Sequence, residues 1–286
     1  MSNAHAPIPK GGTGFDVTMH EPGIALVTFN QPDRMNAMTQ GFKRDLIEFI
    51  THAQMNNHIR VVVFTGTGRA FIAGDDLSGY HGHDPASVPM IDGGHDTPVG
   101  TANGLRVFSQ ALNLAVRNLD KLSIAAINGF AIQTGLSLAL SCDFRLASTE
   151  AKLGSATLRF GLLPDEGGQY LLVQHLGIGR AMDFLMRKRI VDAQEALNLG
   201  LVSEVVSPDT LTTRALELAT ELANGPQVAM RMLKRSLYVA ADSTFEKALE
   251  DIAVRTAVTD HHDDAREGGR SFKEKRTPKF NAWLDL

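Results

Sequence analysis

Ser123-Ile-Ala-Ala-Ile-Asn128, followed by Gly129 and then by Thr134-Gly-Leu-Ser-Leu-Ala-Leu-Ser141, decides the fold of this chain. The first run is short and apolar throughout its centre, which is typical of a strand buried on both faces of a parallel sheet. Gly129 predicts a turn, and the second run has the pattern of a helix. A strand that turns directly into a helix is the repeating element of α/β proteins.

Strands and helices alternate along the first two-thirds of the chain. We expect strands at 17–30, split by the turn Glu21-Pro22-Gly23, at 60–65 and at 143–147, and helices at 39–55 and 105–119. The capping box Asp192-Ala-Gln-Glu195 predicts a further helix that Gly200 ends. After Pro208 only helical periods occur, at 211–222, 228–239 and 243–258.

These patterns predict an α/β protein with three parts. Residues 1–14 would form a flexible arm, residues 15–207 the α/β core, and residues 208–286 a helical oligomerisation segment. The apolar faces of such a segment pack against another subunit or fold back on the chain's own core. Residues 79–104 contain many Gly and Pro and show no periodicity, so we expect a long functional loop there.

Composition excludes several classes of protein. The chain has 286 residues, of which 43% are hydrophobic and 21% charged, as in ordinary globular proteins. A net charge of −4 is unsuited to general binding of nucleic acid or anionic membranes. The single cysteine, Cys142, excludes a disulfide within the chain, indicates a reducing cytoplasmic compartment and is expected to be an inert core thiol. No membrane span or signal peptide is predicted.

Known phosphate-binding and nucleophile motifs are absent from the sequence. The glycine-bearing stretches match neither the dinucleotide fingerprint nor the P-loop, and there is no G-x-S-x-G elbow. His81, His83 and His95 lie in the long loop without the spacing of a metal site, so we expect no metal. The run His261-His-Asp-Asp264 is expected on a solvated helix face.

The start of the helix at Thr134 is the first candidate for chemistry. Free N–H groups and the positive end of the helix dipole gather at such a start, where they can hold negative charge on a carbonyl oxygen. Gly135 would allow close approach of another group. The alternative interpretation is a tight turn that only packs a helix on a sheet.

Four segments in this order resemble the crotonase (enoyl-CoA hydratase/isomerase) superfamily. They are Val27-Thr-Phe-Asn-Gln-Pro-Asp-Arg-Met-Asn-Ala-Met38, residues 62–77, residues 123–147 and residues 264–280. The resemblance covers roughly Phe15 to Phe280. It implies a spiral of ββα units with a helical C-terminal trimerisation segment, assembled as a trimer or a dimer of trimers.

The resemblance also implies an acyl-CoA thioester substrate and no metal or redox cofactor, with coenzyme A entering only as part of the substrate. The backbone N–H groups of Asp75 and Thr134 would polarise the thioester carbonyl. The backbone at Ala73 would meet the adenine of CoA. Further substrate-binding positions implied by the family are Ala37, Gly74, Asp76, Leu77 and Gly135. Arg34, Lys279 and Phe280 would contact the CoA phosphates and adenine, the last two from the neighbouring subunit.

Departures from the family pattern indicate the reaction. The two glutamates of hydratases fall on Ser137 and Thr157, which line the substrate site but cannot act as carboxylate acid or base. Asp165 remains, at a position where isomerases of the family carry a carboxylate. The alternative is that Asp165 caps a helix that begins near Gly167. Its neighbour Glu166 is expected to be solvated.

We therefore expect an acyl-CoA double-bond isomerase or related lyase, with Asp165 as acid and base. The resemblance implies that dehalogenation would also need a helix histidine and a tryptophan beside the aspartate. It is disfavoured because the chain has no histidine between His95 and His175, and its only tryptophan is Trp283. Two alternatives stay open. One is a hydratase or hydrolase of an unusual acyl-CoA, in which Asp165 steers water. The other is a catalytically inert CoA-binding protein.

Overall fold

Two sheets organise the chain in the computed structural model, which describes residues 7–76 and 97–285. The seven strands of the larger sheet stand in the order β1 (Gly11–Gly12), β2 (Phe15–His20), β3 (Ile24–Phe29), β4 (Val61–Gly66), β6 (Leu122–Ile127), β8 (Phe144–Ser148) and β11 (Glu204–Val206). From β3 to β11 the neighbouring strands are parallel, while β1 and β2 pair antiparallel at one edge. Every residue of β6 is buried, as its apolar run predicts.

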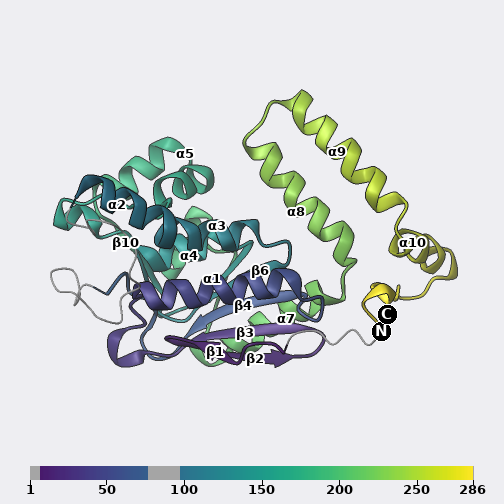
Figure 1. Cartoon of the computed structure of the whole chain (residues 1–286), viewed down its shortest axis with the longest axis horizontal. Helices are drawn as coiled ribbons and strands as arrows, with labels where there is room; N and C mark the ends of the chain where they lie inside the picture. Colours follow the sequence, from purple (N-terminus) through teal and green to yellow (C-terminus); the bar gives the residue numbers. More distant parts are fainter. Residues whose placement is uncertain (1–6, 77–96, 286) are drawn as a thin grey trace.

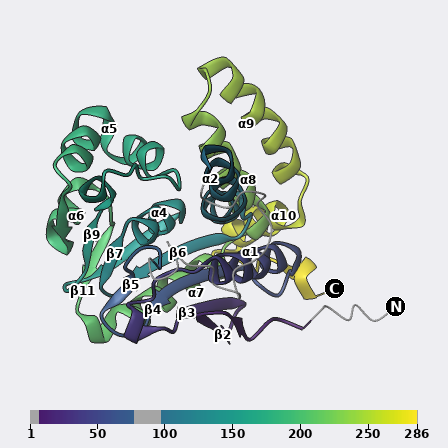
Figure 2. The same cartoon turned by 60° about the vertical axis from the view of Figure 1, so that its left-hand side comes forward.

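The smaller sheet gives the fold its spiral path (Figure 2). Its strands stand in the order β10 (Ile190–Asp192), β9 (Lys152–Gly154), β7 (Phe130–Ile132) and β5 (Ala70–Ile72). Strands β4, β6 and β8 of the larger sheet each continue into β5, β7 and β9 and then into helical segments. Three successive ββα turns therefore stack side by side, and the expected spiral is confirmed. The three-residue strands of the smaller sheet were not predicted.

Helices cover both faces of the larger sheet. One face packs on α1 (Gln40–Met55), α3 (Gln110–Asn118) and α4 (Thr134–Ser141). The other face packs on α7 (Leu211–Asn224), whose Leu211, Ala215 and Ala219 contact the residues of β4 and β6. Helix α7 therefore packs on the core, which is the second of the two arrangements expected for the C-terminal helices, and residue 208 does not mark where the core ends. Its small buried side chains allow it to lie close to the sheet.

Three further predictions differ from the structure. Gly11 and Gly12 of the expected arm pair with Asp16 and Phe15 as β1. The described end of the expected loop, residues 97–104, contains α2 (Pro98–Gly104), because the Thr97 hydroxyl accepts a hydrogen bond from Gly100 N and Pro98 suits the first helical turn. The predicted helix at 105–119 begins with a π-helical turn, Leu105–Ser109, before α3.

The remaining helices have the following bounds. They are α5 (Gly168–Met186), α6 (Ala193–Leu199), α8 (Gln227–Ala241), α9 (Phe245–Asp260), α10 (Asp263–Glu274) and short 3-10 turns at Pro32–Arg34, Thr157–Phe160, Pro208–Thr210 and Ala282–Asp285. The predicted cap at Asp192, whose side chain accepts from Glu195 N, and the stop at Gly200 are confirmed, but the Glu195 carboxylate pairs with Arg189. Within residues 7–76 and 97–285, no helix is long and apolar enough to cross a membrane.

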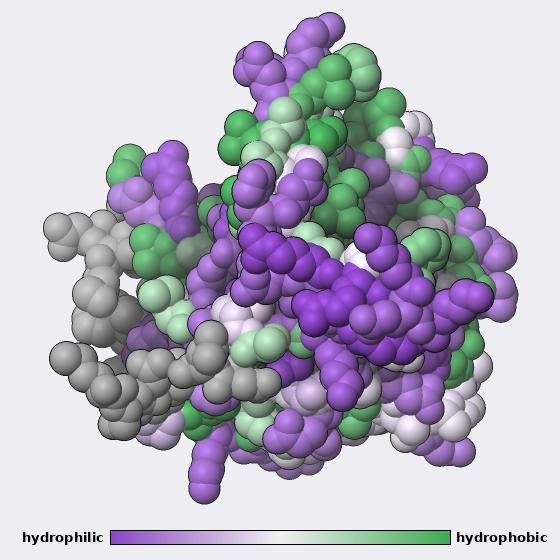
Figure 3. Space-filling view, turned by 90° about the vertical axis from the view of Figure 1, so that its right-hand side faces the viewer, coloured by the Kyte–Doolittle hydropathy of each residue, from purple (hydrophilic) through white to green (hydrophobic). Residues whose placement is uncertain are grey.

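Helices α8, α9 and α10 extend away from the two sheets (Figures 1 and 2). Large apolar side chains lie exposed along α8 and α9, and the most exposed are Leu233, Leu237, Phe245 and Val254. Figure 3, which views this end of the molecule, shows apolar groups in its upper part and a hydrophilic area in front. The apolar faces expected on the C-terminal helices are therefore exposed on α8 and α9.

Helix α8 is tied to the body by a buried ion pair. Lys234 Nζ lies 2.8 Å from Asp143 Oδ2 and 3.0 Å from the carbonyl oxygen of Lys121. Asp143 Oδ2 also accepts hydrogen bonds from the N–H and hydroxyl of Ser123, and Tyr238 donates to Asp143 Oδ1. The ammonium group and the carboxylate are thus each satisfied several times in a site that water barely reaches.

We predict that Lys234→Ala lowers the free energy of unfolding by about 3 kcal/mol, because it leaves the buried Asp143 charge without its cation. Arg235→Ala is the matched control, because Arg235 pairs with Asp120 at a half-exposed position. That change should cost less than about 1 kcal/mol. Equal losses for the two variants in urea unfolding would contradict the importance of the buried pair.

Candidate functional site

The segment 73–76 presents one backbone donor to the start of α4. Met38 N donates to Gly74 O, and Asp76 N donates to Met38 O, each at 3.0 Å. Because these two bonds flank Asp75 in a parallel bridge, the N–H of Asp75 points to the opposite side. Gly74 has a φ of +119°, which few residues other than glycine adopt.

The second donor lies at the first residue of α4, as predicted. The N–H of Thr134 is in the first helical turn and has no acceptor within the helix. Within the described parts of the chain, neither this N–H nor that of Asp75 has a hydrogen-bond partner. The Thr134 hydroxyl lies 2.6 Å from Asp75 Oδ1 and joins the two residues. The predicted pair of oxyanion donors is thus brought together.

Gly135 holds α4 against β5, and Figure 2 shows these two elements side by side. A Cβ at Gly135 would lie 2.2 Å from the carbonyl oxygen of Ile72, so only glycine fits. The close approach expected at this glycine is therefore made by the strand that leads to Asp75. This contact sets the separation of the two donors.

Gln133 precedes α4 in a conformation that normally belongs to glycine, with φ +50° and ψ −102°. Its amide makes hydrogen bonds at both ends. Nε2 donates to Glu166 Oε2 at 2.7 Å, and Oε1 accepts from Ser155 Oγ at 2.7 Å and from Thr157 Oγ1 at 3.2 Å. These bonds offset the backbone strain and were not predicted from the sequence.

Glu166 is buried, contrary to the expectation that it is solvated. Only 3% of its surface is exposed, and Oε1 lies 2.6 Å from Thr134 Oγ1. Asn113 of α3 donates to the carbonyl oxygen of Glu166 and so fixes the loop from within the core. Burial, followed by the charges of Asp75 and Asp165, raises the pKa of Glu166 to about 7.

Asp165 is half-buried beside Glu166. Gln110 Nε2 donates to its carbonyl oxygen at 3.1 Å. Burial and then the charge of Asp75 raise the pKa of Asp165 above its usual value, while the charge of Lys43 lowers it. Helix α5 begins at Gly168 with Gly167 as its N-cap and no side-chain capping bond. The alternative role of Asp165 as a helix cap is therefore wrong.

A buried lysine completes the cluster. Lys43 of α1 is 3% exposed, and its Nζ lies 2.7 Å from Asp75 Oδ2 and 2.8 Å from Ser109 Oγ. The burial of Lys43 was not predicted, although its position in the predicted helix indicates it. Lys43 precedes Leu46 by three residues and Ile50 by seven, so it lies on the buried face of the predicted helix.

Ser137 and Thr157, at the glutamate positions of hydratases, both lie around Gln133. Ser137 N donates to Gln133 O at 2.9 Å, and Thr157 Oγ1 donates to the side chain of Gln133. Ser137 is buried, and its Oγ would lie 2.9 Å from a Cβ at Gly168. Thr157 therefore supplies a hydroxyl group to the buried Gln133 amide, while the Ser137 hydroxyl lies near Gly168.

The predicted CoA contacts fall into two separate groups. Arg34 forms an ion pair with Asp76, and Ala73 N donates to Met35 O, so residues 34–38 lie alongside residues 73–76. Ala37 belongs to this first group. Lys279 and Phe280 contact Glu267 and Gly268 of α10, and Figure 1 shows α10 away from α4. Within a single chain, the two groups of predicted CoA contacts therefore lie apart.

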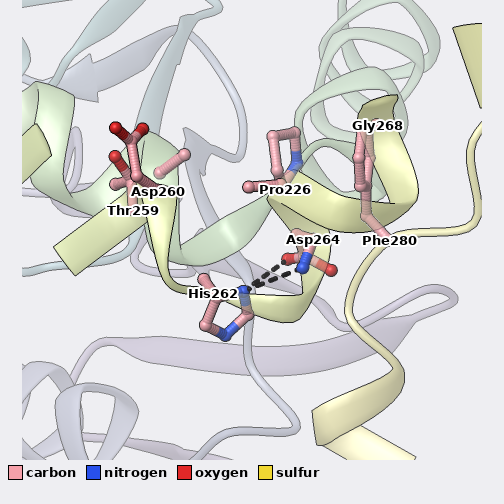
Figure 4. A pocket seen from close by; sticks show the side chains of 9 residues that line it. Pro226, Thr259, Asp260, His262, Asp264, Gly268 and Phe280 are labelled. Atoms are coloured by element: carbon pink, nitrogen blue, oxygen red, sulfur yellow. Dashed lines mark hydrogen bonds and ion pairs between the residues drawn. The ribbon is translucent and has the colours of Figure 1, made fainter. Parts of the chain in front are cut away.

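Phe280 borders a pocket of about 270 Å³ between α8 and α10. Figure 4 shows it facing Gly268, with Pro226, His262 and Asp264 also in the lining.

Leu77, His81, His83 and His95 lie outside the described residues. Among those described, no three His, Cys, Asp or Glu residues form a group that could hold a metal ion. Cys142 is buried, and burial raises the pKa of its thiol to about 12, as expected for an inert core residue.

Comparison with known proteins gives consistent results. The family model described as enoyl-CoA hydratase/isomerase matches residues 19–282. A 1,2-epoxyphenylacetyl-CoA isomerase of Escherichia coli is 32% identical over 91% of this chain and 95% of its own length. A short-chain-enoyl-CoA hydratase of Clostridium acetobutylicum is 29% identical over 90% and 93%. The crystal structure of an enoyl-CoA hydratase/isomerase from Cupriavidus metallidurans has a TM-score of 0.86, with 27% identity over 95% of this chain and 97% of that one.

The strain at Gln133 leads to a prediction about stability. Gln133→Ala loses the side-chain hydrogen bonds and keeps a backbone conformation that alanine adopts poorly, whereas Gln133→Gly loses the bonds and relieves the strain. The alanine variant should be less stable than the glycine variant by about 1 kcal/mol. Denaturant unfolding of both variants measures the difference, and a more stable alanine variant would show that the backbone is unstrained.

The buried carboxyl leads to a prediction about pH. Because the pKa of Glu166 is raised from about 4.5 to about 7 on folding, the folded chain binds more protons than the unfolded chain between these values. The contribution of Glu166 to stability is full below pH 4.5 and declines as pH rises to 7. Glu166→Gln, which mimics the protonated group, should therefore gain up to about 3 kcal/mol relative to the parent between pH 5 and pH 8. A constant difference in unfolding free energy would contradict the burial of a protonated carboxyl.

Proposed function

Because the chain belongs to the enoyl-CoA hydratase/isomerase family, we propose that it is an acyl-CoA double-bond isomerase or a related lyase that uses Asp165 as acid and base. The observation that carries this proposal is the pair of N–H groups of Asp75 and Thr134, which have no partner among residues 7–76 and 97–285, beside the half-buried Asp165. Ser137 and Thr157 offer no carboxylate in place of the two hydratase glutamates.

In this reaction the thioester oxygen accepts hydrogen bonds from the N–H groups of Asp75 and Thr134. These donors stabilise the negative charge that develops on the oxygen when a neighbouring carbon loses a proton. The Asp165 carboxylate takes that proton and returns it to another carbon of the conjugated enolate, so the double bond moves. Its raised pKa favours both halves of this transfer near neutral pH.

Coenzyme A lies, in our proposal, along residues 34–38 and 73–76. Arg34 belongs to these residues and has half of its side chain exposed, where it can meet phosphate groups. Lys279 and Phe280 contact the same CoA from a neighbouring subunit. The exposed apolar faces of α8 and α9 hold the chains together as a trimer or a dimer of trimers. The reaction moves only a proton and needs no redox or metal cofactor.

A second candidate is hydration or hydrolysis of an unusual acyl-CoA. The hydratase relative and the presence of Glu166 near Asp165 favour it, because two carboxyls could orient and activate water. An inert CoA-binding protein is less favoured. Burying ionisable groups with raised pKa values destabilises a fold, and such groups gather at active sites.

We predict that incubation with enoyl-CoA and dienoyl-CoA thioesters in heavy water places deuterium on the acyl carbons without adding oxygen. Asp165→Asn should reduce this exchange at least about 100-fold, because it removes the proton carrier. Asp209→Asn, at an exposed turn, is the matched control and should exchange like the parent. A mass gain of one water would instead indicate a hydratase, and loss of CoA a hydrolase. Full activity of Asp165→Asn would contradict the proposed role.

A further inference from the structure

One hydroxyl group lies between two carboxyl groups in this site. Thr134 Oγ1 is 2.6 Å from Asp75 Oδ1 and 2.6 Å from Glu166 Oε1, and both distances are typical of strong hydrogen bonds. A threonine hydroxyl has a single hydrogen to donate. If both carboxyls were ionised, one of these contacts would set oxygen against oxygen with no hydrogen between them. One carboxyl must therefore carry a proton.

The surroundings of the two carboxyls identify which one it is. Asp75 is 39% exposed at its side chain, and its Oδ2 accepts from the Lys43 ammonium group. Glu166 is almost fully buried, its Oε2 accepts from the neutral amide of Gln133, and a hydrogen bond with its side chain partly offsets the burial that raises the pKa of Asp165. The charged groups that face Glu166 are Asp75, Asp165 and, with the opposite sign, Lys43. The proton therefore resides on Glu166, the buried carboxyl that no ammonium group of the described residues contacts.

We propose that Glu166 is a positioning residue that keeps a proton in the resting enzyme and, through Thr134, orients the two N–H groups that receive the thioester oxygen. This inference rests on the proposed function. The Glu166 carboxyl donates to Thr134 Oγ1, and the Thr134 hydroxyl donates to Asp75 Oδ1. Both oxyanion donors thus belong to residues in one chain of directed hydrogen bonds that begins at Glu166.

Loss of the Glu166 proton has two consequences for the site. Thr134 can then donate to only one of the two carboxylates, so one link of the chain breaks. A third negative charge also appears beside Asp75 and Asp165, close to where the enolate oxygen forms, and repels it. Catalysis therefore requires Asp165 ionised and Glu166 protonated. The rate falls at high pH as the proton leaves Glu166 and at low pH as Asp165 is protonated.

The protonation state can be measured without any substrate. In protein labelled with carbon-13 at glutamate carboxyls, one signal should titrate well above the others and be missing in Glu166→Gln. The amide nitrogen signals of Asp75 and Thr134 should shift with the same midpoint in the parent and stay constant in Glu166→Gln. Thr134→Val, which keeps the backbone N–H and removes the hydroxyl, should uncouple the Asp75 signal from this titration. Glu150→Gln, at an exposed turn, is the matched control and should titrate like the parent.

Activity provides the second test. Glu166→Ala should lower the exchange rate roughly 10- to 100-fold. Glu166→Gln should recover at least about tenfold of this loss and lack the decline at high pH, because it copies the hydrogen bonds of the protonated carboxyl.

The inference would be overturned if Glu166 were ionised at pH 6, or if the amide signals of Asp75 and Thr134 did not shift when Glu166 titrates. A decline at high pH that persists unchanged in Glu166→Gln would overturn the positioning role. Full exchange by Asp165→Asn would instead contradict the proposed function and leave the carboxyl titration as a separate result.

Discussion

The packing of the first turn of α4 against β5 is the constraint on which the site depends. Gly135 lies so close to the Ile72 carbonyl that no side chain fits between them. Strand β5 leads within three residues to Asp75, and α4 begins at Thr134, so this one contact fixes the separation of two backbone donors. Donors held in this way need no reorganisation when charge develops on a bound oxygen.

Around the donors the chain buries a group of ionisable side chains, which is costly unless each one is paired. The free-energy cost of burying these groups is offset by a connected series of short hydrogen bonds and one ion pair. Lys43 neutralises Asp75, Thr134 links Asp75 to Glu166, and Gln133 saturates the other oxygen of Glu166. Glu166 avoids a buried charge by holding a proton. Asp165 stays half-exposed, as a carboxyl must if it exchanges protons with a ligand.

The sequence predicted the parts of this structure that rest on local periodicity or on several motifs together. The strands near β4, β6 and β8, the start of α4 at Thr134 and the spiral path were all predictable. The three-residue strands β5, β7 and β9 were not, because they are too short to show a period. The burial of Glu166 also escaped prediction, because it depends on Asn113 and Gln133, which are distant in sequence. The packing of α7 on the larger sheet could not be predicted and stayed one of two alternatives, because its pattern does not reveal which surface it covers.

Gln133 and Glu166 restrict how this site can change by single substitutions. Glu166 without Gln133 would bury a carboxyl with one oxygen unsatisfied, and Gln133 without Glu166 would keep a strained backbone with fewer compensating bonds. Each residue is acceptable mainly in the presence of the other, so the fitness effect of changing one depends on the identity of the second. Substitutions at positions 133 and 166 are therefore expected to have coupled, non-additive effects. A change at either position alone therefore passes through one of two costly intermediates, an unsatisfied buried carboxyl at 166 or a strained backbone at 133 that has lost a hydrogen bond.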